Sequence, residues 1–583
     1  MNEMTANAGF KPAVPSWLSG LLKGPQRLRL PIYAWLVALV IIPNALLLIT
    51  SFMSSSGGAI VYSPTLANYQ SIVGSMTVQT LIFKTIAVAL VSTLLATVIA
   101  YPLAFYISRN LVRGKTVAAL MVIIPLWISL LMRVFAWRVI LGEKGILNTV
   151  LLDLGIIAKP SSLFLYTPFS VVLTFTTMAI PLVFVAAYAA IERVPFSLVE
   201  AARDNGASKF RTFTSLIWPL TRQGTGIGIA LAFLMSIGDY VTPSMVGGIN
   251  GTMIGMAISS QFGMAGNWPL GAAMAVYLML LVTLLLGGLF MLTRTRGVLT
   301  EVDVGAAPQI SEWSRLSSGQ KASRVVKKVL FVLPYLLLYA PLLVIMMFSF
   351  NDSSVQALPL KGFTMKWYSE LLANTALLSA LWRSVELALI TTLVGVVVGT
   401  GFAFVFASWQ GRGAALLENL IAFPLAVPGV VLGISMVMTA SSIGIAPGMG
   451  RLIVGHLVFV MPVILLVVTA RLRRVDPSFA LASRDLGAGR LVTFWKIQLP
   501  MIRGAIIGGA LLGFTLSVDE VVVSLFLSGT EPTLPVYVWN QTRFGFTPSV
   551  NAIFTCIGVI SLAAVIVAQK LINASHARST SHS

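Results

Sequence analysis

The sequence is poor in charged residues, and above all in acidic ones. Only 10% of its 583 residues are charged, and 39 Lys and Arg outnumber 19 Asp and Glu. A soluble protein of this size carries about 25% charged residues. Because 57% of this chain is hydrophobic, its composition excludes a water-soluble globular protein and predicts a polytopic membrane protein.

Cysteine and histidine are nearly absent. Cys556 is the single cysteine, which excludes an intrachain disulfide and a multi-cysteine metal site. The three histidines are too scattered for a metal cluster. Hydrolase and metalloprotease motifs are missing, and the segment 113–116 lacks the first glycine of a phosphate-binding loop. We therefore expect no catalytic residues, no cofactor and no metal on this chain.

Long apolar runs dominate what is present. A transmembrane helix needs about 20 apolar residues. Runs of this kind lie at about 31–53, 80–107, 117–141, 167–191, 221–243, 269–292, 329–350, 377–407, 414–438, 452–471, 502–527 and 549–569. We predict an all-α protein with twelve transmembrane helices.

Positive charges gather in alternate loops. Most Lys and Arg lie in the N-terminal tail and in the loops near 109–115, 293–328 and 471–503, whereas residues 54–79 carry no charge. The positive-inside rule places these basic loops and both termini in the cytoplasm. The net charge of +20 then needs no nucleic acid as a partner.

Two of the basic loops repeat each other at an offset of 281 residues. Residues 200–207 read Glu-Ala-Ala-Arg-Asp-Asn-Gly-Ala, and residues 481–488 read Leu-Ala-Ser-Arg-Asp-Leu-Gly-Ala. A preceding proline, a polar stretch and a glycine predict a short helix, a turn and a second helix in each loop. Since each half holds six spans, the halves form a parallel repeat.

The first loop resembles the EAA loop of ABC importer permeases through Glu200, Ala201, Ala202, Gly206 and Pro219. The second loop keeps the glycine and the proline but lacks the Glu-Ala-Ala triplet.

Further segments resemble the two permease subunits of polyamine-type importers. They are 131–137, 423–433, 517–524 and 533–537.

The resemblance implies the type I ABC importer permease fold in two parallel six-helix repeats. It divides the chain into a cytoplasmic tail 1–30, a permease domain 31–293 with EAA loop 192–220, a linker 294–328, a permease domain 329–570 with EAA loop 473–502, and a tail 571–583. It also implies a bacterial inner-membrane location. Implied partners are ABC ATPase subunits, as a homodimer that binds ATP and Mg, and a periplasmic solute-binding protein.

The same resemblance implies that both EAA loops dock on the ATPase. We expect the first to dominate, because its Glu-Ala-Ala triplet is intact. The implied coupling residues are Glu200, Ala201, Ala202, Asp204, Gly206, Pro219, Arg484, Asp485, Gly487 and Pro500.

Ionisable and aromatic residues near the outer ends of spans are candidates for a substrate path, since charge at membrane depth is costly. They are Asp239, Tyr240, Asp519, Glu520, Arg133 and Trp137. The acids would attract a cation, and capping of the following loop is an equal alternative. For Arg133 we favour snorkelling to the interface. Arg383 is expected to pair with Glu386 on one helix face.

The favoured function is ATP-driven import of a polyamine such as spermidine or putrescine. Iron, thiamine, opines and aminophosphonates remain alternative solutes. A secondary transporter with two parallel six-helix repeats is the alternative from another class, and a membrane-bound enzyme has little support.

Overall fold

The computed structural model describes residues 29–111, 114–293, 321–409, 411–544, 548–560 and 563. The expected C-terminal tail and most of the expected N-terminal tail and linker lie outside these residues. Helices make up nearly all of the described structure, and its one sheet is the hairpin β1 (Ser54–Ser56) and β2 (Ala59–Val61).

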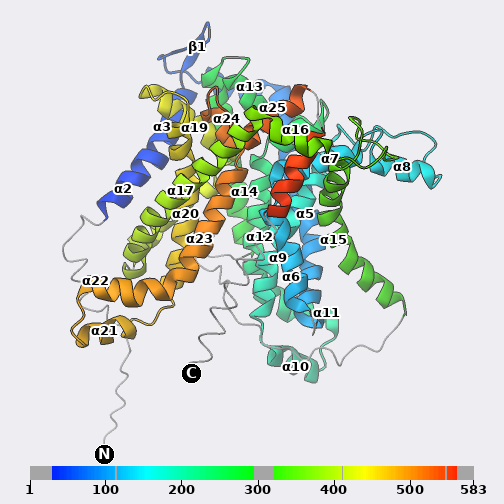
Figure 1. The fold of residues 1–583 in the computed structure, drawn as a ribbon. Coiled ribbons are helices and arrows are strands. Elements are labelled where there is room, and N and C mark those ends of the chain that lie inside the picture. The colour runs from blue at the N-terminus through cyan, green and yellow to red at the C-terminus, as the bar shows by residue number, and fades with distance from the viewer. Residues whose placement is uncertain are drawn as a thin grey trace, which may run out of the picture.

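The two halves repeat one order of long helices (Figure 1). The first half holds α2 (Leu30–Leu36), η2 (Val37–Ile41), α3 (Ile42–Ser51), α5 (Met76–Asn110), α6 (Lys115–Ile123), η3 (Ile124–Trp127), α7 (Leu130–Leu141), α9 (Pro168–Glu192), α12 (Trp218–Gly238) and α14 (Trp268–Thr293). The second half holds α15 (Lys321–Ser349), α17 (Thr375–Ser408), α18 (Arg412–Ala422), η7 (Phe423–Ala426), α19 (Gly429–Ser442), α20 (Met449–Leu472) and α23 (Leu499–Asp519).

Short elements connect these helices. At the end opposite the EAA loops, Figure 1 shows among others α8 (Ile146–Asp153), α13 (Ile254–Phe262), α16 (Lys366–Ala373), α24 (Val522–Leu527) and α25 (Leu534–Phe544). The remaining short elements there are α4 (Ala67–Gly74) and η5 (Pro243–Gly247).

Two predicted spans are bent rather than straight. Within the described residues nine helices are long and apolar enough to span a membrane, or up to eleven if each of two bent pairs counts as one span. The pairs bend by 95° at Ile128–Ser129 and by 102° at Val427–Pro428, so the spans predicted at 117–141 and 414–438 are each broken near their middle. Pro125 and Pro424 lie in the 3-10 turns before each bend, where the missing N–H favours a break.

The last predicted span is described only in part. Residues 549–560 form an apolar helix that is shorter than a span. The rest of the predicted range 549–569, apart from one residue, lies outside the described residues.

The first helix of each half packs against the other half. Helix α3 packs on α19, and the Arg29 guanidinium lies 3.9 Å from the centre of the Trp409 ring. In return α15 packs on α5 and α7. The hydroxyls of Tyr335 and Tyr339 donate to the carbonyls of Ala118 and Met121 at 2.8 and 2.7 Å. The halves are therefore interlocked as well as adjacent.

Helix α9 packs between α5 and α12, and α20 packs between α17 and α23 in the same way. A Cβ at Gly224 or Gly228 would lie 2.7 Å from the Cβ of Ala190 or Ala186, so the absence of a side chain at these glycines allows α9 and α12 to pack closely.

The glycines of α23 divide into two kinds. Gly513 packs closely against α20, whereas no atom lies within 4 Å of a Cβ at Gly504 or Gly508, so those two do not lie at a close helix contact.

Figure 1 shows that the two helix bundles meet at the end carrying α13 and α24 and diverge toward the EAA loops.

Candidate functional site

The first EAA loop forms the predicted helix, turn and helix. Helix α10 (Phe196–Asp204) ends in a turn in which Gly206 N–H donates to the Arg203 carbonyl at 2.8 Å and Ala207 N–H to the Ala202 carbonyl at 3.0 Å. These are the two hydrogen bonds of a Schellman C-cap. Gly206 has a φ of +78°, which only glycine adopts without cost.

The second EAA loop has the same geometry. Helix α21 (Ser478–Asp485) ends where Gly487 N–H donates to the Arg484 carbonyl at 2.9 Å and Ala488 N–H to the Ser483 carbonyl at 3.1 Å. Gly487 has a φ of +83°. Each hydrogen bond recurs at the offset of 281 residues, so the repeat found in the sequence is also a repeat of backbone structure.

The helix after each turn begins earlier than predicted. In the first loop α11 (Lys209–Thr212) continues through the π-helix η4 (Phe213–Ile217) into α12. In the second, α22 (Arg490–Thr493) continues through the π-helix η8 (Phe494–Gln498) into α23. Pro219 and Pro500 are the second residues after these π-helices, whose wider turns accommodate a proline without breaking the helix.

The two EAA loops differ in how their short helix is anchored. Val199 of α10 is buried against Val194 and Ile217. The residues 281 positions later are Ala480, Val475 and Gln498; Ala480 is also buried, but its side chain is smaller, and Gln498 is polar. The first short helix is therefore held by more apolar surface than the second.

Both EAA loops leave large apolar side chains uncovered. Phe210 is 76% exposed in the first loop, and Leu486 and Leu491 are 88% and 75% exposed in the second. Glu200, Asp204 and Asp485 are also exposed. Apolar side chains among exposed charges are typical of a surface that binds another protein.

A second group of candidate residues lies where the halves meet. The Asp519 carboxylate, at the end of α23, accepts the backbone N–H of Leu130 at 2.9 and 3.0 Å. Leu130 is the first residue of α7, in the other half. The partial positive charge of a helix N-terminus favours a carboxylate there. Asp519 thus connects the two halves at the bend of the third span.

Asp239 and Glu520 cap the turns that follow them. Asp239 accepts the backbone N–H groups of Val241 and Thr242 at 2.7 and 3.1 Å. Glu520 accepts the Val523 N–H at 2.9 Å and lies within electrostatic reach of both aspartates. For these two acids the capping alternative is confirmed. Together Asp239, Asp519 and Glu520 form what we call the acidic cluster.

Arg133 is buried beside the acidic cluster, one helical turn after Leu130. Its side chain interacts electrostatically with Asp519 and Asp239, and only 8% of the residue is exposed. Its Nε and Nη1 atoms find no hydrogen-bond partner among the described residues. The snorkelling expected for Arg133 is therefore wrong, because the side chain lies inside the protein.

The aromatic candidates divide between two places. The Tyr240 ring lies 6.3 Å from the Phe526 ring and 6.4 Å from the Trp539 ring, both in the other half. Trp137 instead donates its Nε1–H to the Thr177 hydroxyl at 3.0 Å, in an apolar cluster of the first half.

Arg383 does not make the ion pair expected of it. Its guanidinium contacts the Glu531 carboxylate at 2.6 Å, so the predicted pairing with Glu386 is wrong.

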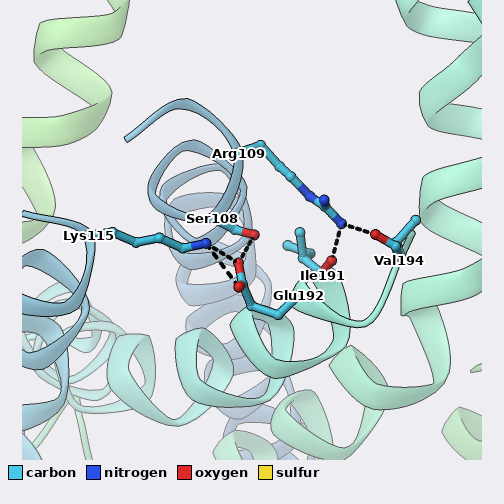
Figure 2. Close-up of polar contacts among 6 residues, drawn as sticks. All are labelled: Ser108, Arg109, Lys115, Ile191, Glu192 and Val194. Atoms are coloured by element: carbon cyan, nitrogen blue, oxygen red, sulfur yellow. Dashed lines mark hydrogen bonds and ion pairs between the residues drawn. The ribbon is translucent and has the colours of Figure 1, made fainter. Parts of the chain in front are cut away.

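Sequence reasoning missed a charged cluster at the end of α9, directly before the first EAA loop (Figure 2). Lys115 contacts the two Glu192 carboxylate oxygens at 2.8 and 2.9 Å, and Ser108 also donates to this carboxylate. Arg109 donates to the carbonyls of Ile191 and Val194. The basic neighbours of Lys115 suggested a solvated loop charge, but its side chain is held in an ion pair.

Buried His456 was also missed. Its two ring nitrogens lie 2.8 and 2.9 Å from the hydroxyls of Ser517 and Ser524, so it joins α20 to α23 and α24.

The fold and the paired loops define a duplicated, polytopic α-helical transport permease. The model of the family described as binding-protein-dependent transport system inner membrane component matches residues 100–295 and again residues 395–580. The chain belongs to this family.

Named relatives agree with the assignment. The chain is 33% identical over 256 residues to the spermidine/putrescine transport system permease protein PotB of Haemophilus influenzae, covering 44% of this chain and 89% of that protein. It is 36% identical over 237 residues to the putrescine transport system permease protein PotI of Escherichia coli, covering 39% and 84%. Each relative matches less than half of this chain, as expected for a fusion of two permease subunits.

A solved structure, of a bacterial ABC transporter involved in the import of the acidic polysaccharide alginate, has a TM-score of 0.38 and 15% identity. It covers 48% of this chain and 96% of the matched one. The relatives are transport permeases and not enzymes.

Proposed function

We propose that this chain is the fused permease of an ATP-driven, binding-protein-dependent importer for a polyamine such as spermidine or putrescine. The observation that carries the substrate class is the acidic cluster, where three carboxylates lie within electrostatic reach of one another and the buried Arg133 interacts with two of them, Asp519 and Asp239. Two of the relatives above are named for the same amines. Family membership decides against a secondary transporter.

In this conformation the space beside Asp519 is too small for a polyamine. A space of about 80 Å³ lies beside Asp519, lined among others by Trp127 and Ser129. Small-molecule sites measure roughly 300–1,000 Å³. We propose that the halves separate here during transport, so that the Asp519 carboxylate leaves the Leu130 N–H and accepts a substrate ammonium.

In this proposal Arg133 is the resident counterion of the acidic cluster. It balances part of the negative charge while the halves are closed. When they open, the ammonium groups of a diamine or triamine balance this charge instead. Arg133 makes no side-chain hydrogen bond through Nε or Nη1 that would resist this exchange. A buried charge whose hydrogen-bonding groups are incompletely paired is costly, which favours a transient arrangement.

The partners follow from the family and from the exposed EAA loops. We propose that a homodimer of ATPase subunits, which bind ATP and Mg, docks on α10 and α21. A periplasmic binding protein would deliver the solute at the opposite end, where the halves meet. Both termini would then lie in the cytoplasm of a bacterial cell with an inner membrane.

The test is reconstitution in liposomes with the ATPase and the binding protein of the same transport system. ATP-dependent uptake of labelled putrescine or spermidine is expected, with competition by the other amine. Ferric iron, thiamine, an opine and an aminophosphonate serve as alternative solutes in the same assay. Uptake of one of these without amine uptake would replace the polyamine proposal.

A further inference from the structure

The charged cluster around Glu192 lies between the first EAA loop and the rest of its half. Glu192 is the last residue of α9, and only three residues separate it from α10. One of these is Pro195, whose ring fixes its φ. A docked partner that displaces α10 therefore also displaces the end of α9.

Arg109 stiffens this connection. The last carbonyls of a helix lack partners within it. The Arg109 guanidinium donates to the carbonyls of Ile191 and Val194, which span the end of α9, and only 8% of the residue is exposed (Figure 2). Because Arg109 lies at the end of α5, it ties the start of the EAA loop to that helix.

Glu192 extends the connection to the bent third span. Lys115 is the first residue of α6, and the Lys115 and Glu192 side chains are only 15% and 16% exposed. Helix α6 leads through η3 to the bend, beyond which the Leu130 N–H donates to Asp519 of the other half. Side-chain contacts and continuous backbone thus connect α10 to the acidic cluster.

The second half makes the same connection with the charges exchanged. The residue 281 positions after Glu192 is Arg473, at the end of α20. Its guanidinium contacts the Glu418 carboxylate at 2.7 Å, and Glu418 belongs to α18, the first part of the second bent span. In both halves an ion pair therefore joins the end of the helix before the EAA loop to the first part of the bent span. The acid lies at the helix end in the first half and on the bent span in the second.

We infer that the ion pairs Lys115–Glu192 and Arg473–Glu418 couple each EAA loop to the bent span of its own half. Glu192, Lys115, Arg473 and Glu418 are then positioning residues for energy coupling. The first pair carries more of the coupling, because Ser108 and Arg109 reinforce it and because the side chain of Arg473 is 40% exposed.

Charge exchange tests the inference. Permease variants are reconstituted with the ATPase and with the binding protein purified with its own ligand, and stimulation of ATP hydrolysis is measured. Glu192→Lys and Lys115→Glu are each expected to lower stimulation about tenfold, within the usual range of coupling between sites. Both changes together should restore it to within about twofold, as expected for residues in contact.

Two further measurements separate coupling from docking and folding. Co-purification of the ATPase should be unchanged in all three variants, because the pair lies behind the docking surface. The exposed pair Lys366–Glu370 on α16 controls for charge reversal as such: its single and double reversals should leave the membrane level and the co-purification of the ATPase unchanged. If the charge-reversal variants at 115 and 192 do not reach the normal level in the membrane, Glu192→Gln is used instead. It retains the shape of the side chain and should still lower the stimulation of ATP hydrolysis.

Normal stimulation in Glu192→Lys or Glu192→Gln would overturn the inference. So would a loss that the double exchange leaves unrepaired, because the ion pair would then not be the link. The readout does not depend on which solute the binding protein carries, so a substrate other than a polyamine would leave it intact.

Discussion

Gly206 and Gly487 are the single residues on which the shape of each EAA loop depends. No atom lies within 4 Å of a Cβ built on either, so a side chain there meets only the backbone cost of a positive φ. Gly206→Ala should destabilise the turn by about 1 kcal/mol. Gly206→Pro should abolish ligand-stimulated ATP hydrolysis while the protein stays in the membrane, because proline requires a φ near −65°.

Gly487→Pro is the matched variant in the second EAA loop. A smaller loss of stimulated hydrolysis is expected there, because the first loop has the intact Glu-Ala-Ala triplet and the larger apolar anchor. Normal transport by Gly206→Pro would contradict a docking role for the loop. A greater loss in Gly487→Pro would contradict only the asymmetry.

The substrate proposal leads to a prediction for two single residues, Asp519 and Asp239. A pair of unit charges about 4 Å apart interacts by roughly 4 kcal/mol at an effective dielectric constant near 20. Asp519→Asn keeps an oxygen for the Leu130 N–H but removes the charge. Polyamine uptake should therefore fall by at least about tenfold, with the membrane level little changed.

Asp153→Asn, at an exposed acid on α8, controls for general effects of charge. Unchanged uptake in both Asp519→Asn and Asp239→Asn would leave these acids as structural caps only.

Among the elements, the two short helices of the EAA loops are predicted to differ in stability. Val199→Ala removes two buried methyl groups from the contact with Val194 and Ile217, a loss of roughly 1–3 kcal/mol. Amide hydrogen exchange over 196–206 should accelerate, and stimulated hydrolysis should fall. Ala480→Val adds apolar surface to the second short helix and should slow exchange over 478–487. Equal exchange in both wild-type loops would refute the difference in anchoring.

Sequence patterns predicted those elements whose signals are local. The turn glycines and the prolines act within a few residues, and the same pattern occurs twice at an offset of 281 residues, so α10 and α21 could be predicted. Hydropathy shows that a run is apolar but not which way it points, so the bends at Ile128–Ser129 and Val427–Pro428 were not predictable.

Contacts between residues far apart in the sequence could not be predicted from the sequence patterns. The partner of Asp519 is a backbone N–H 389 positions earlier, and a backbone group leaves no trace in the residue type. The pair Lys115–Glu192 joins residues 77 positions apart, and Lys115 resembled any other cytoplasmic loop charge. Aligning the halves at 281 would have placed Glu192 opposite Arg473, which was the available signal.

For the whole molecule, the predicted orientation can be tested by labelling. Ser55, in β1, and Lys159, after α8, lie near the end opposite the EAA loops, whereas Ser311 lies outside the described residues. In a Cys556→Ser background, an impermeant thiol reagent should label cysteines at 55 and 159 from outside spheroplasts. A cysteine at 311 should react only after lysis. Labelling at 311 from outside would reverse the orientation.

The exchange of first helices between the halves also sets an order of assembly. Trp409, which stacks on Arg29, is 380 positions further along the chain. At about 5–20 residues per second, the ribosome reaches it ~20–75 s after Arg29. The α3 face that will pack on α19 must spend that time among lipids. The face of α3 that packs on α19 is thus covered later than the face that packs on α14, and protein quality control in the membrane can act on it during that time.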